Sequence, residues 1–172
     1  MGEEGFNRLS IEGVAARAGV GKTTIYRWWP TKGALAVEAF LNAVAPTIAF
    51  PQSAAPDDDL RRQMHALATL YRGSTGRFVR EMIAASQSDL AMRQAFVDGF
   101  LAPRRCAAHA VIQRGVEAGI FSPDTDPDLA IDALYGPIYY RLLATGAPID
   151  DAFVNGLADL VLAGLQSGGD GA

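Results

Sequence analysis

The sequence predicts an all-α protein, with an N-terminal helix-turn-helix head followed by a C-terminal helical bundle. Apolar residues recur at helical spacing, and Gly- or Pro-rich stretches separate the successive helical segments. No segment shows the alternating pattern of a half-buried strand, and there is no internal repeat. Hydrophobic residues make up 49 % of the 172-residue chain, which is enough to bury a substantial core in one or two domains.

The helix-turn-helix is predicted within residues 10–32. Ser10 is a favourable N-cap for its first helix. A narrow apolar stripe follows this cap and consists of Ile11, Val14 and Ala15. Gly19 is expected at the turn, because glycine readily adopts the positive φ that a sharp reversal needs.

The second short helix is predicted to have one core face and one polar face. The core face is expected to contain Ile25, Trp28 and Trp29, at i, i+3 and i+4. The other face carries two i, i+4 pairs, Lys22 with Tyr26 and Thr23 with Arg27. This mixture suits duplex DNA, because cations neutralise phosphates, hydroxyls bind phosphate oxygens and a few side chains reach base edges. Spacing alone leaves one alternative open, an ordinary packed helix pair with a solvated charged face.

The charge distribution favours a nucleic-acid contact at this head. The formal net charge of the chain is −4, yet the segment from Arg8 to Lys32 holds five basic residues and a single acidic one, Glu12. The rest of the chain is acidic, so any contact with DNA must be concentrated in this segment.

At residues 18–32 the run AGVGKTTIYRWWPTK, preceded by Leu9 to Ala15 and followed by Leu35, resembles the DNA-binding domain of TetR-family transcriptional regulators. The resemblance implies an all-α homodimer whose larger C-terminal domain binds a small-molecule effector and carries the dimer interface. It implies that phosphates are held by Ser10, Thr24, Tyr26 and Lys32. It also implies that Lys22, Thr23 and Arg27 lie nearest the bases, with Ile25 and Trp29 in the core.

The sequence departs from the family pattern at three places. Gly21 stands where a capping serine is usual, and Gly33 stands where an acidic residue is usual. Family members also carry a full helix before the segment equivalent to Glu4 to Phe6, where this sequence has only Met1 to Glu4. We therefore expect an apolar surface without its cover, which would destabilise the head, leave it to be covered by a partner, or weaken DNA binding. That surface would comprise Phe6, Ile11, Val14 and Leu35. A late start, a shortened chain and a naturally incomplete head are all open explanations.

Other functional motifs are weaker. Residues 16–23 fit a relaxed phosphate-loop pattern, but a phosphate loop must follow a buried strand and open a long helix. Here a helical pattern precedes it, and Pro30 stops the following helix within about two turns. No carboxylate pair, nucleophile with a base, or metal triad supports an enzyme, so no cofactor, metal or catalytic residue is expected.

Cysteine and histidine usage is equally uninformative about chemistry. The single cysteine, Cys106, excludes an intrachain disulfide and is interpreted as a small core residue, with redox sensing as an alternative. Two histidines are too few for a metal-ligand cluster. No signal peptide and no long apolar span is visible, which favours a cytoplasmic protein without a membrane partner.

The bounds of the remaining helices are predicted from N-cap residues and from the prolines and glycines that end helices. Thr31 is expected to cap a connecting helix, which completes a head over residues 1–45. A Pro-rich loop then leads to an effector-binding and dimerisation domain over 57–166, with a disordered tail over 167–172. Its helices are predicted at about 60–72, 77–85, 89 to the break at Pro103, 104–118, 127–145 with a kink at Pro137, and 150–166.

The last two helices are the candidate dimer seam, since they carry apolar residues on more than one face. The candidate seam residues are Leu134, Ile138, Leu142, Val154, Leu157, Val161 and Leu165. An effector pocket among the C-terminal helices is predicted to be lined by Met64, Tyr71, Phe78, Met82, Phe96, Phe100 and Tyr139. For both sets, ordinary core packing is the alternative.

Two function hypotheses follow. The leading one is a ligand-responsive repressor that binds palindromic operator DNA as a homodimer and is released by a small-molecule effector. The alternative is a dimerisation or sensing module whose truncated head does not bind DNA by itself.

Overall fold

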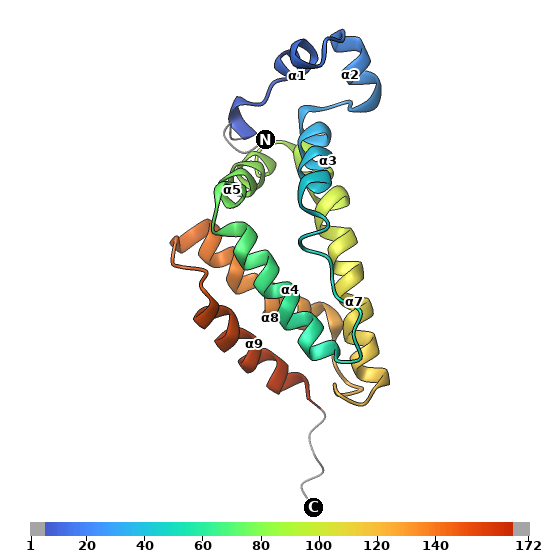
Figure 1. The fold of residues 1–172 in the computed structure, drawn as a ribbon, viewed down its shortest axis with the longest axis vertical. Helices are drawn as coiled ribbons and strands as arrows, with labels where there is room; N and C mark the ends of the chain where they lie inside the picture. The colour runs from blue at the N-terminus through green and yellow to red at the C-terminus, as the bar shows by residue number, and fades with distance from the viewer. Residues whose placement is uncertain (1–5, 167–172) are drawn as a thin grey trace, which may run out of the picture. The chain divides into compact units, whose positions relative to one another are not determined.

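The structure is a computed structural model that describes residues 6–166, so the predicted tail at 167–172 lies outside the described residues (Figure 1). The described part is helical, and its only β-type pairing is an isolated bridge between Phe121 and Gln166. The predicted all-α class is therefore confirmed. Within the described residues, no helix is long and apolar enough to cross a membrane.

The chain divides into two compact units that alternate along the sequence. The first unit contains the residues up to Pro46 together with Gly73–Pro103. The second contains Thr47–Arg72 together with the residues from Arg104 onward. Segment 73–103 thus folds with the helix-turn-helix, although the sequence groups it with the C-terminal helices.

In the first unit, two helices begin at N-caps that the sequence predicts. Thr31 accepts a hydrogen bond from the Ala34 N–H at 3.0 Å, and Asp89 accepts one from the Met92 N–H at 3.1 Å. The elements of this unit are η1 (Phe6–Arg8), α1 (Ile11–Ala18), α2 (Lys22–Trp28), α3 (Lys32–Val44), α5 (Ser74–Ser86), α6 (Leu90–Phe96) and the π-helical η2 (Val97–Leu101).

An aromatic cluster fills the core of the first unit. Phe40 stacks on Phe78 at 5.9 Å between ring centroids and meets Phe100 edge-on at 5.4 Å. Helix α3 approaches α6 and η2 closely, because a glycine lies at each contact: Gly33 of α3 against α6, and Gly99 of η2 against α3. A Cβ on Gly33 would lie 2.7 Å from the Met92 sulfur, and one on Gly99 would lie 2.7 Å from a Val37 methyl. Packing therefore explains the glycine at position 33, where the family usually has an acidic residue.

The second unit is a bundle whose helices enclose their own core. Its elements are α4 (Pro56–Tyr71), α7 (Ala102–Glu117) from Arg104 onward, α8 (Pro127–Tyr140), the π-helical η3 (Arg141–Thr145) and α9 (Asp151–Leu165). The predicted break at Pro103 is wrong. Pro103 is the second residue of α7, and the π-helical η2 continues directly into that helix, so the backbone stays helical through the proline.

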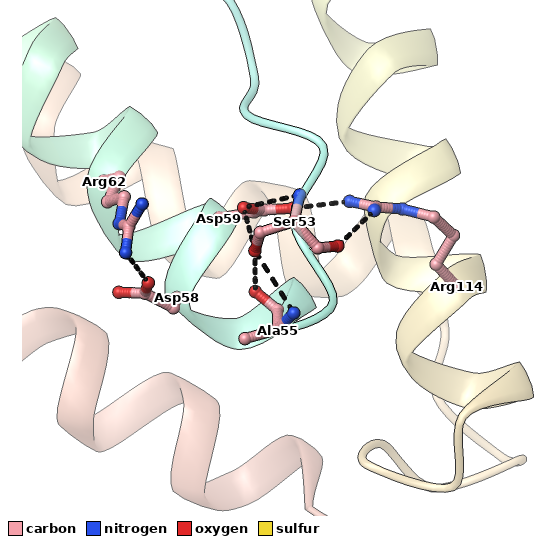
Figure 2. A network of polar contacts seen from close by, with 6 residues as sticks. All are labelled: Ser53, Ala55, Asp58, Asp59, Arg62 and Arg114. Atoms are coloured by element: carbon pink, nitrogen blue, oxygen red, sulfur yellow. Dashed lines mark hydrogen bonds and ion pairs between the residues drawn. The ribbon is translucent and has the colours of Figure 1, made fainter.

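The segment between Thr47 and α4 is fixed by a polar network centred on the buried Asp59 (Figure 2). Asp59 has no exposed surface and accepts hydrogen bonds from the Ser53 N–H at 3.0 Å and the Ser53 hydroxyl at 2.7 Å. Arg114 of α7 donates to the same carboxylate at 2.7 Å and to the Ser53 carbonyl at 2.9 Å. Burial by itself raises the pKa of Asp59, but the bonds from Ser53 and Arg114 outweigh it and leave that pKa below its ordinary value.

Cys106 is exposed on α7, so its interpretation as a core residue is wrong. Small size is compatible with either face of a helix, and the buried face of α7 is formed instead by Ala108, Val111, Ile112 and Gly115.

Candidate nucleic-acid interface and effector site

The turn between α1 and α2 has the geometry that the sequence predicts. The Ser10 hydroxyl accepts a hydrogen bond from the Gly13 N–H at 3.0 Å and caps α1. Gly19 has φ 67°, and the Val20 N–H donates to the Ala15 carbonyl at 3.0 Å. The chain therefore reverses sharply and starts α2 after Gly21, which offers no side-chain cap.

Helix α2 is anchored by a small apolar cluster beneath it. Ile25 is 6 % exposed and packs with Ile11, Ala15 and Leu35, while Val14 and Trp29 are partly buried against them. The Trp29 indole N–H also donates to Glu38 of α3 at 2.9 Å. These contacts hold α2, which we call the recognition helix, on α1 and α3.

The expectation of an uncovered apolar surface is wrong for three of its four residues. Ile11 and Leu35 are buried in the cluster under α2, and Phe6 is 5 % exposed. Phe6 packs edge-on against Phe78 of α5 at 6.1 Å, a partner that is far away in sequence. Only Val14 remains half-buried, beside a cavity of about 300 Å³ along α1.

The predicted inward orientation of Trp28 is also wrong. Its side chain is 71 % exposed, at the last position of α2. Of the three predicted inward residues, only Ile25 and Trp29 pack in the apolar cluster. Trp28 lies on the outer edge of the helix, one turn after Thr24. Sequence analysis missed this residue as a candidate contact, although an exposed indole beside a cationic face is a suitable surface for a phosphate backbone.

The polar face of α2 points away from the anchor. Five predicted DNA-binding residues are exposed on this short helix, namely Lys22, Thr23, Thr24, Tyr26 and Arg27. The other two lie elsewhere. Ser10 is exposed at the start of α1, and Lys32 is half-buried with its ammonium 4.3 Å from the centre of the Phe6 ring.

Lys22 forms an ion pair with Glu12 of α1 at 2.8 Å. Hydrogen bonding between the two groups raises the pKa of Lys22 and lowers that of Glu12. Both side chains are more than half exposed, so solvent screens the attraction and the pair is weak. The ammonium of Lys22 can therefore exchange Glu12 for another anion.

The residues predicted to line an effector pocket are divided between the two units. Phe78, Met82, Phe96 and Phe100 belong to the first unit, where the phenylalanines are part of the aromatic core. Met64, Tyr71 and Tyr139 belong to the second unit.

In the second unit, Tyr71 and Tyr139 are members of a larger polar cluster. Their hydroxyls are 3.0 Å apart, and the Tyr135 hydroxyl donates to Gln63 at 2.6 Å. Gln63 and Arg104 both donate to the Ile48 carbonyl, the former at 3.4 Å. Burial raises the pKa of each tyrosine and lowers that of Arg104. We call these residues the tyrosine–arginine cluster: Gln63, Tyr71, Arg104, Tyr135 and Tyr139.

Most of the predicted dimer residues are buried within the chain itself. Leu134, Ile138 and Val154 have no exposed surface, Leu142 and Leu157 are at most 9 % exposed, and Val161 and Leu165 are half-buried. The exposed large apolar residues of α8, η3 and α9 are different ones, namely Leu129, Tyr140, Leu143 and Leu160.

Comparison with known proteins agrees with this architecture. The family described as "Bacterial regulatory proteins, tetR family" matches residues 1–39, and the family described as "Tetracyclin repressor-like, C-terminal domain" matches residues 50–161. The HTH-type transcriptional regulator YdeS of Bacillus subtilis is 32 % identical over 96 % of this chain and 83 % of its own length. The DNA-binding transcriptional repressor TetR of Mycobacteroides abscessus is 34 % identical over 92 % of this chain and 84 % of its own length.

Solved structures show the same fold. The crystal structure of the TetR-family transcription regulator SCO0332 is 39 % identical, with a TM-score of 0.86 over 95 % of this chain and 91 % of that chain. The transcriptional regulator FadR of Bacillus subtilis, solved with stearoyl-CoA, has a TM-score of 0.69 at 18 % identity and is similar in fold alone. With the recognition helix exposed on its anchor and both family domains matched, the chain belongs to the TetR family of non-enzymatic, DNA-binding transcriptional regulators.

Proposed function

We propose that this regulator is a ligand-responsive repressor that binds a palindromic operator as a homodimer, in the bacterial cytoplasm, and is released by a small-molecule effector. The observation that carries the proposal is the recognition helix. Its exposed side combines Lys22, Thr23, Tyr26 and Arg27, and its buried side is anchored by Ile25. A relative that is 34 % identical is named a DNA-binding transcriptional repressor, which supports repression over activation.

Packing and hydrogen bonds support the recognition helix. Its anchor is apolar and buried, and the helix α1 on which it packs is capped by Ser10, so the exposed side chains are presented from a supported backbone. We assign Lys22, Thr23 and Arg27 to the bases. We assign the phosphates to Ser10, Thr24, Tyr26 and Lys32, and add Trp28 beside Thr24.

The outer faces of α8 and α9 are the proposed dimer seam. On α8, Leu129 and Tyr140 lie on the same side as Gly136, beside which there is open space. On α9, Leu160 lies one turn after Gly156, which is also open. Glycines let two helix pairs approach closely, and the large exposed apolar side chains beside them become buried when the pairs associate. The buried residues Leu134, Ile138 and Val154 hold these helices on their own bundle.

Two-fold symmetry then determines the form of the operator. Two recognition helices in one dimer reach successive major grooves when they are about 34 Å apart, or a multiple of that distance. An effector that favours another separation shifts the population away from the DNA-binding arrangement.

The alternative, a dimerisation module with a head that does not bind DNA by itself, rests on an uncovered apolar surface. Three of the four residues concerned are buried, namely Phe6, Ile11 and Leu35. Of that surface, only Val14 remains half-buried.

Selection of bound fragments from a random DNA pool tests the proposal. We expect an inverted repeat, bound by a dimer as judged by light scattering, and Arg27→Ala should weaken binding by about tenfold or more. Leu160→Asp should give monomers that bind the same repeat poorly. An enriched sequence without symmetry, or unchanged binding by Arg27→Ala, would contradict the proposal.

A further inference from the structure

We propose that the effector carries a carboxylate, which binds to the Arg104 guanidinium and the tyrosine hydroxyls of the tyrosine–arginine cluster. This inference rests on the proposed function, since it names the chemical class of the effector. It also gives the carboxylate a direct effect on the segment that follows α3.

The cluster is rich in hydrogen-bond donors. Tyr71 and Tyr139 share one hydrogen bond at 3.0 Å, although their two hydroxyls carry two hydrogens. One of these hydrogens is therefore not used in their mutual bond. The guanidinium of Arg104 adds a positive charge and a planar fork of N–H groups, which fits the two oxygens of a carboxylate.

The surroundings favour an organic anion over a hydrated ion. Tyr71 is 4 % exposed and Gln63 is 1 % exposed, while Arg104, Tyr135 and Tyr139 are half-buried, so the cluster is partly shielded from water. The Phe50 ring lies 5.6 Å from the Arg104 guanidinium, and Met64 is fully buried on the same helix as Gln63 and Tyr71. Hydrogen bonds to a charged group gain strength in such a low-dielectric environment.

All of the charged and donor groups come from three helices of one unit. Tyr135 and Tyr139 are one turn apart on α8, Gln63 and Tyr71 lie on α4, and Arg104 lies on α7. Arg104 is connected to this group through the Ile48 carbonyl, to which it and Gln63 both donate, and Gln63 in turn accepts from the Tyr135 hydroxyl. The next residue, Arg105, pairs instead with Asp128 and Asp132, which are exposed on α8.

The same cluster is bonded to the chain that leaves α3. Gln63 and Arg104 both donate to the carbonyl of Ile48, four residues after the end of α3 at Val44. A carboxylate bound to Arg104 competes with this carbonyl for the guanidinium. Effector binding therefore loosens the start of segment 47–55, whereas its other end stays fixed by Asp59 and Arg114.

Calorimetric titration of the full chain with acid and amide pairs tests the inference. The probes are benzoate, octanoate and indole-3-acetate, each compared with its primary amide, which has nearly the same shape but no charge. We expect at least one acid to bind about tenfold or more tightly than its amide. The inference is contradicted if no acid binds, or if every acid binds no better than its amide.

Variants locate the site. Arg104→Gln should weaken binding of the preferred acid by about tenfold or more and abolish its advantage over the amide, while Arg105→Gln should leave both unchanged. Tyr139→Phe keeps the ring and should weaken acid binding by a few-fold, which covers the case in which Arg104→Gln does not fold. Acid binding that is unchanged in Tyr139→Phe, and in any folded Arg104→Gln, overturns the assignment.

Binding of the selected operator without any acid separates the two proposals. If the wild-type chain binds the operator but does not discriminate acids from amides, only the carboxylate inference fails. If it binds no operator at all, the proposed function fails, whatever the titrations show.

Discussion

Two ion pairs of nearly equal length, one in each unit, have opposite surroundings. Lys22 and Glu12 are 2.8 Å apart, with both side chains more than half exposed. Arg114 and Asp59 are 2.7 Å apart, and the carboxylate is fully buried. The exposed pair is a weak contact that a DNA phosphate can replace, whereas the buried pair fixes the backbone at Ser53. The N–O distance of an ion pair therefore does not show whether the pair is exchangeable or structural, whereas the burial of its side chains does.

The largest effect is expected for the buried pair. Asp59→Ala should lower the free energy of unfolding by about 3 kcal/mol, because Arg114 and the Ser53 N–H lose a buried acceptor. Urea unfolding measures this loss. Asp58→Ala is the matched control, since Asp58 is the preceding residue and pairs with Arg62 at 2.5 Å on the exposed side of α4. Equal losses in the two variants would show that burial is not what separates these pairs.

The same carboxylate predicts a dependence on pH. The pKa of Asp59 in the folded chain lies below its ordinary value of 3.8, so its contribution to stability is complete above that pH. The contribution is lost as the pH falls through the folded-state pKa, because the protonated acid no longer pairs with Arg114. The Asp59→Asn variant has no titrating group at this position. Its urea midpoint should therefore fall less than that of the wild-type chain as the pH is lowered from about 5 to about 3. Parallel curves would contradict this explanation.

Replacing Trp28 tests whether an uncharged exposed residue of α2 contributes to operator binding in addition to Lys22 and Arg27. Trp28→Ala should weaken operator binding by a few-fold, as an estimate for one lost backbone contact, without changing stability. Fluorescence anisotropy with labelled operator measures the change. Leu90→Ala removes another strongly exposed apolar side chain, at the start of α6, and should bind as the wild-type chain does. If both variants bind equally well, Trp28 lies outside the interface.

The smallest effect is expected at Glu12. Glu12→Gln removes the acid that competes with phosphate for Lys22 and should tighten operator binding by about twofold. Glu117→Gln makes the same charge change at an exposed position of α7 and should have no effect. Weaker binding by Glu12→Gln would mean that the acid positions Lys22 for DNA and does not compete with phosphate.

Local features of this fold were predictable from sequence, because their causes lie within a few residues. The Ser10 cap, the left-handed Gly19 and the Thr31 cap each depend on neighbours three or four positions away. The buried Ile25 followed from helical spacing, but spacing could not show that the anchor is too narrow to cover Trp28 as well.

The features that the sequence did not predict depend on distant partners. Phe6 is covered by Phe78, and Asp59 is paired with Arg114, 55 positions away. The tyrosine–arginine cluster joins residues of three helices, of which only Tyr71 and Tyr139 were predicted for an effector site. Tyr135 was visible as an i, i+4 partner of Tyr139, but nothing local connected either of them to Arg104.

The central claim is that the exposed face of α2 binds the phosphates and bases of operator DNA. The most direct test is the salt dependence of operator binding by the wild-type chain and by Lys22→Gln. If Lys22 replaces a counterion on DNA, the variant should bind more weakly, and its slope of log K against log salt concentration should be smaller in magnitude by about one. Identical slopes and affinities would contradict the account.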